Sequence, residues 1–462
     1  MQIKLFGAAK TVTGSCYSLV TGKDKILVDC GMFQGSKKET ALNYNTFGFN
    51  PRIYSALLLT HAHLDHCGRI PKLVKAGFRG RILCTSATKD LANIIMLDSA
   101  KINQHDIELE NKRRQRLGKP PREPIYTEKD VENTMKLFKV IEYNKIVKVS
   151  ENISAVFYDA GHILGSSSIQ VEVTEKGKKK TVVFSGDLGQ ENTPIIKSLE
   201  YIKEADYVFV ESTYGDRIHP PIAERKQELL NVIHETYNNS GKVLIPAFAV
   251  ERTQELLYDI NELVEKNLIP KIKVYVDTPM GIRVTEVFKR HPECYNKKIL
   301  EILKSGDNPF SFPGLKYTQT VKESIKLNNL HEPCIIIAGS GMCTGGRIKH
   351  HIKHNIWNKR NTMLFVGYQA KGTLGYYIKR GEKRIRLLGT EVAVKAKIES
   401  IESFSAHADY KGLLNWLRHF SPKPKKIFIM HGEEEAMIPF SKRIEKLGLK
   451  TKIPNIEEEI TL

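Results

Sequence analysis

The sequence predicts an α/β protein in which one α/β domain is inserted into a second, discontinuous domain. Three observations lead to this prediction. Short apolar segments of strand length dominate up to about residue 205, they alternate with helix-length segments from about 206 to 385, and hairpin-like segments return after that. Alternation of strands and helices is typical of a mostly parallel sheet covered by helices. We therefore expect one domain formed by 1–205 and 386–462, and an inserted domain formed by 206–385.

The elements follow from apolar periodicity and turn residues. In the first part we expect a first strand at Met1–Gly7 and further strands at 17–20, 25–29, 56–60, 81–85 and 153–158. A polar helical region should run from 88 to about 140, with a break at Pro120-Pro121. Segments 168–173 and 181–185 should form a hairpin. In the inserted part we expect strands at 207–210, 242–246, 271–276, 334–338 and 362–366, with helices near 222–238 and 251–265. The last part should hold a helix near 409–419, a strand at 426–430 and a helix near 434–447.

Composition narrows the class of protein. The 462 residues are 41% hydrophobic and 27% charged, which is normal for a soluble globular protein. No apolar run reaches the ~20 residues that a membrane span needs, so we expect no membrane partner. The seven cysteines are scattered and form no CxxC pair, which favours reduced thiols and a cytoplasmic location.

The net charge of +19 indicates a polyanionic partner or a lysine-rich solvated surface, and charge alone does not choose between them. A nucleic acid would be attracted through its phosphates. The basic residues concentrate at 112–116, 178–180, 379–386 and 423–426.

The segment 60–66 carries the clearest chemical signal. His61, His63, Asp65 and His66 lie within six positions directly after an apolar strand. Imidazole and carboxylate groups are the ligands of zinc sites that stay open to water. The cluster therefore predicts a hydrolase that uses metal-bound hydroxide. Cys67 adjoins the cluster, and we expect it to be structural.

Further polar residues occur at the ends of other predicted strands, where an α/β scaffold presents side chains to a shared crevice. They are Asp29, His162, Asp187, Glu211 and His431. One such residue alone would be read as a cap or turn residue. Five such residues, together with the histidine cluster, indicate a single shared functional site.

These residues resemble those of a known family. Asp29, the motif His61-x-His63-x-Asp65-His66, His162 and Asp187 resemble the metallo-β-lactamase signature, while Glu211, His407 and His431 resemble the motifs of its β-CASP branch of nucleases. The segments 246–255, 339–347 and 367–373 extend the resemblance over the whole chain. The resemblance implies a metallo-β-lactamase αββα sandwich with an inserted β-CASP α/β domain.

The resemblance also implies residue roles. His61, His63 and His162 would bind one Zn²⁺, Asp65, His66 and His431 a second, and Asp187 would bridge the two. Asp29 would orient a ligand or the bridging water. His407 would be the general acid, held and made more basic by Glu211.

Contacts to the substrate are expected from the inserted domain. The glycine-rich loop 339–347 precedes a helix and is a candidate phosphate site, which nominates Ser340, Thr344 and Arg347. Arg252, Gln369 and Thr373 are further candidates. A tight glycine turn is the alternative reading of the loop. His350, His351 and His354 are expected at the surface of a basic helix.

The sequence therefore predicts a cytoplasmic, dizinc ribonuclease that hydrolyses single-stranded RNA and leaves 5′-phosphate and 3′-hydroxyl ends, with RNA entering between the two domains. A DNA-processing nuclease of the same branch and a small-molecule hydrolase are the alternatives. A third is an inactive RNA-binding subunit, which the complete ligand set opposes. The sequence leaves endonuclease and 5′–3′ exonuclease action open. A homodimer is compatible with this branch, and the stretch 449–454 is not taken as its contact.

Overall fold

The computed structural model describes all residues from 1 to 462, and they form two compact units. Unit 1 consists of residues 1–191, 198–218 and 407–462, and unit 2 of residues 192–197 and 219–406. None of the helices is both long and apolar enough to span a bilayer.

Unit 1 contains two seven-stranded sheets. The strands of the first sheet are, in spatial order, β22 (Glu459–Thr461), β1 (Gln2–Leu5), β2 (Tyr17–Thr21), β3 (Asp24–Val28), β4 (Ala56–Leu58), β5 (Arg81–Cys84) and β6 (Phe138–Val140). Strands β3 to β6 are parallel to one another, and the pairs β22–β1, β1–β2 and β2–β3 are antiparallel.

The second sheet of unit 1 has the order β21 (Thr451–Lys452), β20 (Lys426–Ile429), β11 (Tyr207–Val210), β10 (Lys178–Phe184), β9 (Ser167–Glu175), β8 (Ile153–Asp159) and β7 (Val147–Lys148). Strands β10, β11, β20 and β21 are parallel, and β9 is antiparallel to both β8 and β10. Strands β8, β10, β11 and β20 therefore run in one direction and end at the same edge.

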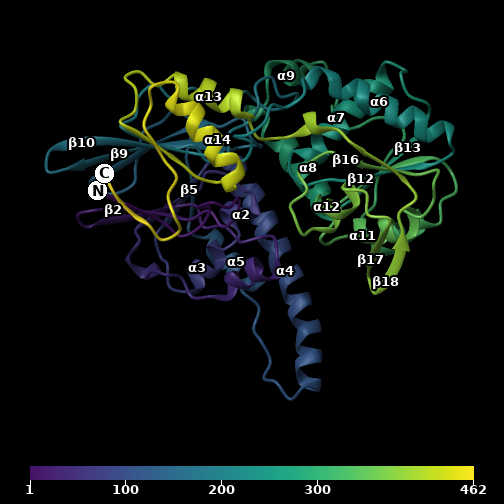
Figure 1. Cartoon of the computed structure of the whole chain (residues 1–462), viewed down its shortest axis with the longest axis horizontal. Coiled ribbons are helices and arrows are strands. Elements are labelled where there is room, and N and C mark those ends of the chain that lie inside the picture. The colour runs from purple at the N-terminus through teal and green to yellow at the C-terminus, as the bar shows by residue number, and fades with distance from the viewer. The chain divides into compact units, whose positions relative to one another are not determined.

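The two sheets of unit 1 pack face to face with helices outside them, which confirms the expected αββα sandwich (Figure 1). The core between the sheets includes Val28 and Leu58 from the first and Phe157, Phe184 and Phe209 from the second. Because side chains alternate along a strand, the opposite faces are also apolar and need cover. The helices of unit 1 are α1 (Lys37–Ala41), α2 (Leu64–Cys67), α3 (Ile70–Lys75), α4 (Ser86–Arg116), α5 (Glu128–Met135), α13 (Tyr410–Arg418) and α14 (Glu434–Glu445).

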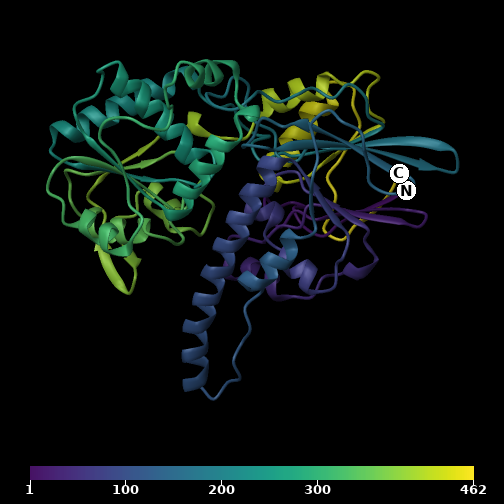
Figure 2. The ribbon, with the colours of Figure 1, turned by 180° about the vertical axis from the view of Figure 1, so that it is seen from behind.

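Helices α13 and α14 cover the second sheet. Val183 and Val208 of the sheet share one buried cluster with Trp416 of α13 and Phe440 of α14. Helices α3, α4 and α5 lie outside the first sheet (Figures 1 and 2). Burial of these apolar faces is the main term that stabilises the sandwich.

Unit 2 is built on a six-stranded, fully parallel sheet. Its order is β14 (Leu315–Tyr317), β13 (Lys273–Asp277), β15 (Cys334–Ala338), β12 (Lys242–Pro246), β16 (Thr362–Phe365) and β19 (Lys397–Ser400). Every residue of β12 and β15 is buried. Continuous burial is expected where helices cover both faces of a parallel sheet.

The connections of unit 2 are mostly helical. Its helices are α6 (Ile222–Asn238), α7 (Arg252–Glu265), α8 (Pro279–Arg290), α9 (Lys297–Lys304), α10 (Val321–Asn328), α11 (Ile348–Asn355) and α12 (Leu374–Lys379). A separate hairpin is formed by β17 (Arg384–Leu387) and β18 (Thr390–Ala393). The helices expected at 222–238 and 251–265 are thus confirmed to within a residue.

Three strands, β11, β18 and β19, lie in a different unit from the one that the expected domain limits of 206 and 385 give. Strand β11 pairs with β10 and β20 of unit 1, and β19 pairs with β16 of unit 2. The sequence of so short a strand does not show which strand it pairs with, because its pattern indicates burial alone.

Candidate metal centre

The candidate residues of unit 1 meet where strands of both sheets end. Asp29 directly follows β3, and the segment His61–His66 follows β4 and enters α2. His162, Asp187, Glu211 and His431 follow β8, β10, β11 and β20, which run in one direction. The topology therefore brings together residues as far apart in the sequence as Asp29 and His431, which are separated by 402 positions.

A first set of candidate ligand atoms consists of His61 Nε2, His63 Nδ1, His162 Nε2 and Asp187 Oδ2. His63 Nδ1 lies 3.2 Å from His61 Nε2 and 3.1 Å from His162 Nε2. Asp187 Oδ2 lies 3.4 Å from His61 Nε2 and 3.6 Å from His162 Nε2. These four atoms enclose a small space.

A second set consists of Asp65 Oδ2, His66 Nε2 and His431 Nε2. The two imidazole nitrogens lie 3.2 Å apart, and Asp65 Oδ2 lies 4.0 Å from that of His66 and 3.5 Å from that of His431. Asp187 Oδ2 lies 3.4 Å from His66 Nε2. The same carboxylate oxygen thus belongs to both sets.

The spacing of these atoms fits tetrahedral zinc. A tetrahedron with metal–ligand distances of 2.0–2.1 Å has edges of about 3.3 Å, and most of the separations above lie near that value. Neither carboxylate oxygen of Asp187 has a hydrogen-bond partner, although both are buried. Buried carboxylates without donors are rare unless they bind a cation. The donor set and the unpartnered carboxylate therefore fit a metal cofactor.

Asp29 orients the ring of His66. Its Oδ2 accepts a hydrogen bond of 2.7 Å from His66 Nδ1, which leaves Nε2 as the ligand atom. Asp29 also accepts hydrogen bonds from the backbone N–H and the hydroxyl of Thr60, each 2.8 Å long. A carboxylate that fixes the tautomer of a ligand histidine is a recurring feature of zinc sites.

Burial and neighbouring charges set the pKa values of the cluster. Burial, with the neighbouring His66, lowers the pKa of His61 to about 3, and burial lowers that of His63 to about 4. Neutral imidazoles offer the lone pairs that a metal needs. Burial alone would raise the pKa of Asp187, but the surrounding histidines hold it well below its usual value.

His407 and Glu211 form a pair beside the cluster. Glu211 Oε1 accepts a hydrogen bond from His407 Nδ1 over 3.1 Å and another from the backbone N–H of Leu188 over 2.7 Å. Burial would lower the pKa of His407, but the Glu211 carboxylate outweighs it and raises the pKa to about 9. The ring of His407 lies 4.5 Å from that of His162 between centroids. A protonated imidazole is thus placed next to the candidate ligands.

Local backbone geometry supports this arrangement. Gly31 packs so closely on the α2 segment that a Cβ there would lie 1.5 Å from the carbonyl oxygen of Asp65. His431 has a φ of 48°, a conformation that is strained for a residue with a side chain. Such strain clusters at functional sites, where the surrounding structure enforces it.

The residues nominated for RNA binding lie in unit 2. Ser340 Oγ accepts a hydrogen bond of 3.1 Å from the backbone N–H of Gly345, and it lies 3.3 Å from Thr344 Oγ1. The guanidinium of Arg347 donates to Asp277 over 2.7 Å and to two backbone carbonyls. The loop 339–347 therefore contains a tight turn that its own side chains stabilise.

The remaining nominated residues also make contacts within unit 2. Arg252 forms an ion pair with Glu255. Gln369 Nε2 donates to the carbonyl of Gly341 over 2.9 Å, and Thr373 Oγ1 accepts a hydrogen bond of 3.3 Å from Tyr376 N at the start of α12. The role of these residues and of the loop in RNA binding stays a prediction.

The expectation for His351 was wrong. His350 and His354 are exposed, but His351 is fully buried and donates to Asp277 Oδ2 over 2.6 Å. The sequence of the basic helix does not indicate this burial, because the partner Asp277 is the last residue of strand β13, far away in the sequence.

Some residues that contact the candidate ligands received no role from the sequence, and they include two threonines. Thr60 Oγ1 lies 3.0 Å from His61 Nδ1 besides bonding Asp29, and Thr213 Oγ1 lies 3.2 Å from His431 Nδ1. Their positions beside motif residues are the only signal that could have indicated them. Cys67, by contrast, is buried and donates to the carbonyl of Ala62, as its structural reading predicts.

Three family models match the chain. The metallo-beta-lactamase superfamily matches residues 9–233, the Beta-Casp domain residues 253–378, and the Zn-dependent metallo-hydrolase RNA specificity domain residues 391–454. Together with the His/Asp cluster, these matches show that the protein has a metal cofactor.

Curated relatives match along the whole chain. Ribonuclease TTHA0252 of Thermus thermophilus is 37% identical, covering 100% of both chains. The RNase J-like protein of Methanocaldococcus jannaschii is 32% identical over 98% of this chain and 97% of its own, and transcription termination factor FttA of the same organism is 32% identical over 98% and 70%. A solved structure of a protein of unknown function from Enterococcus faecalis is 14% identical, covers 100% of this chain and 99% of its own, and shares the fold with a TM-score of 0.54. The resemblance read from the motifs is confirmed, and the chain belongs to the β-CASP family of the metallo-β-lactamase superfamily.

Proposed function

We propose that this protein is a zinc-dependent ribonuclease that hydrolyses phosphodiester bonds of single-stranded RNA. The relatives named as ribonucleases and the match to the RNA specificity domain support RNA as the substrate. The net charge of +19 is consistent with a polyanionic substrate.

The proposed cofactor is a pair of Zn²⁺ ions. His61, His63 and His162 would hold one, Asp65, His66 and His431 the other, and Asp187 would be shared. The observation that carries the proposal is the carboxylate oxygen of Asp187, which lies 3.4–3.6 Å from ligand nitrogens of both sets and has no hydrogen-bond donor. When bound, two zinc ions supply an activated water and neutralise charge on the phosphate.

The protein's own residues supply orientation and a proton. Asp29 holds the ring of His66, so that the ligand atom faces the metal. His407 uses Nδ1 to bind Glu211, which leaves Nε2 to protonate the leaving 3′-oxygen. The products would be a 5′-phosphate and a 3′-hydroxyl. Because all seven cysteines are buried and unpaired, we also propose a reducing, cytoplasmic location.

The test is cleavage of a 5′-labelled single-stranded RNA beside DNA of the same sequence. Wild-type protein, His63→Ala and His407→Ala are compared, and the zinc content of each is measured by mass spectrometry. We expect both variants to lose RNA cleavage, but only His63→Ala to lose zinc. The product ladder distinguishes internal cleavage from cleavage at the 5′ end.

Other outcomes would redirect the proposal. Preferential cleavage of DNA would favour a DNA-processing nuclease. Intact RNA in the presence of zinc-replete wild-type protein, together with hydrolysis of a lactam or thioester, would favour a small-molecule hydrolase. Light scattering of the same samples tests the proposed homodimer.

A further inference from the structure

Helix α4 extends well beyond the part of unit 1 that it helps to cover. It runs for 31 residues, but its buried residues end at Ile107. The remainder projects from the sandwich and returns through the chain that leads to α5 (Figures 1 and 2). We call residues 108–123 the α4 arm. A helix that covers the sheet would need only its first two-thirds, so packing does not explain the arm.

The arm is a defined structure. Asn111 binds the returning chain twice, because its amide donates to the carbonyl of Arg122 over 2.9 Å and accepts the N–H of Arg122 over 2.8 Å. Arg114 donates to the carbonyl of Pro120 over 2.8 Å, and the guanidinium of Arg122 lies 3.7 Å from the ring centre of Tyr44. These contacts fix the shape of the arm with few apolar contacts.

The end of the arm is strongly basic. Residues 112–122 contain six lysines and arginines and no acidic residue. Arg114 and Arg122 both pair with Glu110. The other four cations are exposed and form no ion pair or side-chain hydrogen bond: Lys112, Arg113, Arg116 and Lys119. Arg113 and Arg116 favour the helix C-terminus through its dipole, but like charges this close also repel one another.

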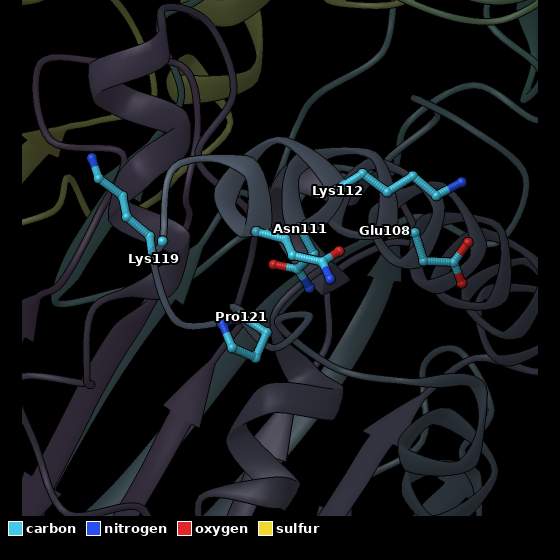
Figure 3. A pocket seen from close by; sticks show the side chains of 7 residues that line it. Glu108, Asn111, Lys112, Lys119 and Pro121 are labelled. Carbon is cyan, nitrogen blue, oxygen red and sulfur yellow. The ribbon is translucent and has the colours of Figure 1, made fainter.

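A hollow of about 720 Å³ lies between the end of α4 and the returning chain. Lys112 and Lys119 extend from either side of it, and Asn111 and Pro121 lie between them (Figure 3). Gln115 adds a free amide to the lining. The lining also contains the carboxylate of Glu108, on the side of Lys112. The two lysines suit the phosphates of an unpaired nucleotide, and the amides suit its polar edges.

We propose that the α4 arm binds single-stranded RNA at a distance from the metal centre. This proposal rests on the proposed ribonuclease function for the identity of the strand. The helix starts beside the centre, because Thr85 and Thr88 donate to the carbonyl of Gly165, three residues after His162. Lys112 follows Ser86 by 26 residues, which places it ~39 Å along the helix axis. A stacked strand that rises about 3.4 Å per nucleotide would need about 12 nucleotides to cover that length.

The arm should therefore act on long RNA and leave short RNA unaffected. The test variant combines Lys112→Gln, Arg113→Gln, Arg116→Gln and Lys119→Gln. A matched control removes the same charge from four other exposed lysines of unit 1, through Lys23→Gln, Lys139→Gln, Lys145→Gln and Lys178→Gln. Glutamine keeps the helix propensity of the α4 positions, and all eight lysines and arginines are exposed, so both variants should fold, which circular dichroism checks.

Binding is measured with unstructured RNAs of about 30 and about 6 nucleotides, respectively longer and shorter than the length estimated above. All proteins carry His63→Ala, so that the RNA stays intact. We expect the arm variant to bind the long RNA at least about tenfold more weakly than the control. The slope of log binding constant against log salt concentration should become shallower by about 2.8, because four phosphate contacts are lost. Equal affinity of the arm variant and the control for the long RNA would overturn the proposal.

Cleavage separates this proposal from the proposed function. With His63 restored, the arm variant should cleave the short RNA at the wild-type rate and the long RNA more slowly at low concentration. A wild-type protein that cleaves neither RNA would refute the ribonuclease function, while the binding comparison would still decide the role of the arm. A loss of short-RNA cleavage equal to that of long-RNA cleavage would contradict a remote binding site.

Discussion

Asp187 is the residue on which both candidate ligand sets depend, because one of its oxygens lies within 3.6 Å of ligand nitrogens in each. Replacing it with alanine should remove zinc from both sets, whereas His63→Ala should remove zinc mainly from one. Mass spectrometry of the native proteins, with His350→Ala as an exposed histidine control, measures the difference. Equal zinc loss in Asp187→Ala and His63→Ala would contradict a shared carboxylate.

Glu211 is predicted to position His407 without binding metal. It is buried and lies near Asp187 and His431, so its carboxylate could also be read as a ligand. We expect Glu211→Gln to lower kcat with little change in KM and none in zinc content, and His407→Ala to lower kcat by about 10²–10⁴-fold. Steady-state kinetics on RNA and zinc analysis of both variants test this. Loss of zinc from Glu211→Gln would show that Glu211 is a ligand.

The structure brings the candidate ligands together, and the sequence could nominate them because they follow strands, which is a local pattern. Their roles stay predictions. The sequence did not predict the burial of His351, which depends on Asp277 in another element. The same limit applies to Arg347, whose charge suggested phosphate but whose guanidinium binds Asp277. Charge and spacing show which chemistry a side chain offers, but they do not show which protein group has already engaged it.

At the scale of elements, Asp277 connects β13 to α10 and α11 of unit 2. It accepts hydrogen bonds from Ser324, Arg347 and His351 and is fully buried. Burial alone would raise the pKa of Asp277, but these donors lower it below its usual value. The folded-state pKa is thus below that of an unfolded Asp, about 3.9. The resulting stabilisation is complete above that pH and is lost as the pH falls through the folded-state pKa.

Asp277→Asn should therefore destabilise unit 2 in a pH-dependent way. At pH 7 we expect the free energy of unfolding to fall by about 3–5 kcal/mol, because the variant leaves buried donors without their charged acceptor. Below the folded-state pKa the difference should shrink, since the wild-type carboxyl is then also neutral. Urea unfolding of both proteins across acidic pH measures it, with the exposed Asp307→Asn as control. A difference that stays constant with pH would contradict the ionised acceptor.

The order of elements was predictable, but the assignment of strands to sheets was less so. Helix-length segments with polar faces gave α6 and α7 nearly to the residue. Strands β11 and β19 pair in units other than the expected ones, because a strand of four residues does not show in its sequence which strand it will pair with. The long polar helix expected from residue 88 to the break at Pro120-Pro121 is confirmed as α4, Ser86–Arg116.

At the scale of the whole molecule, only unit 1 contains the candidate ligands, so metal should stabilise the two units unequally. A ligand that binds only the folded state raises the free energy of unfolding by about 2.7 kcal/mol when its concentration is a hundred times its dissociation constant. Chelation should therefore weaken β4, β10 and β20, whose ends carry the ligands, and leave β12 and β15 of unit 2 unchanged.

Hydrogen exchange followed by mass spectrometry tests this directly, because it reports the opening of each strand separately. Peptides from β10 and β20 should exchange faster after zinc is chelated and regain protection when zinc is restored. Peptides from β12 and β15 should respond instead to Asp277→Asn, which removes an acceptor of unit 2 and no candidate ligand. Each perturbation is thus the control for the other. Equal loss of protection in all four strands on chelation would mean that the units unfold as one cooperative structure, and no change in β10 and β20 would argue against metal binding at the ends of these strands.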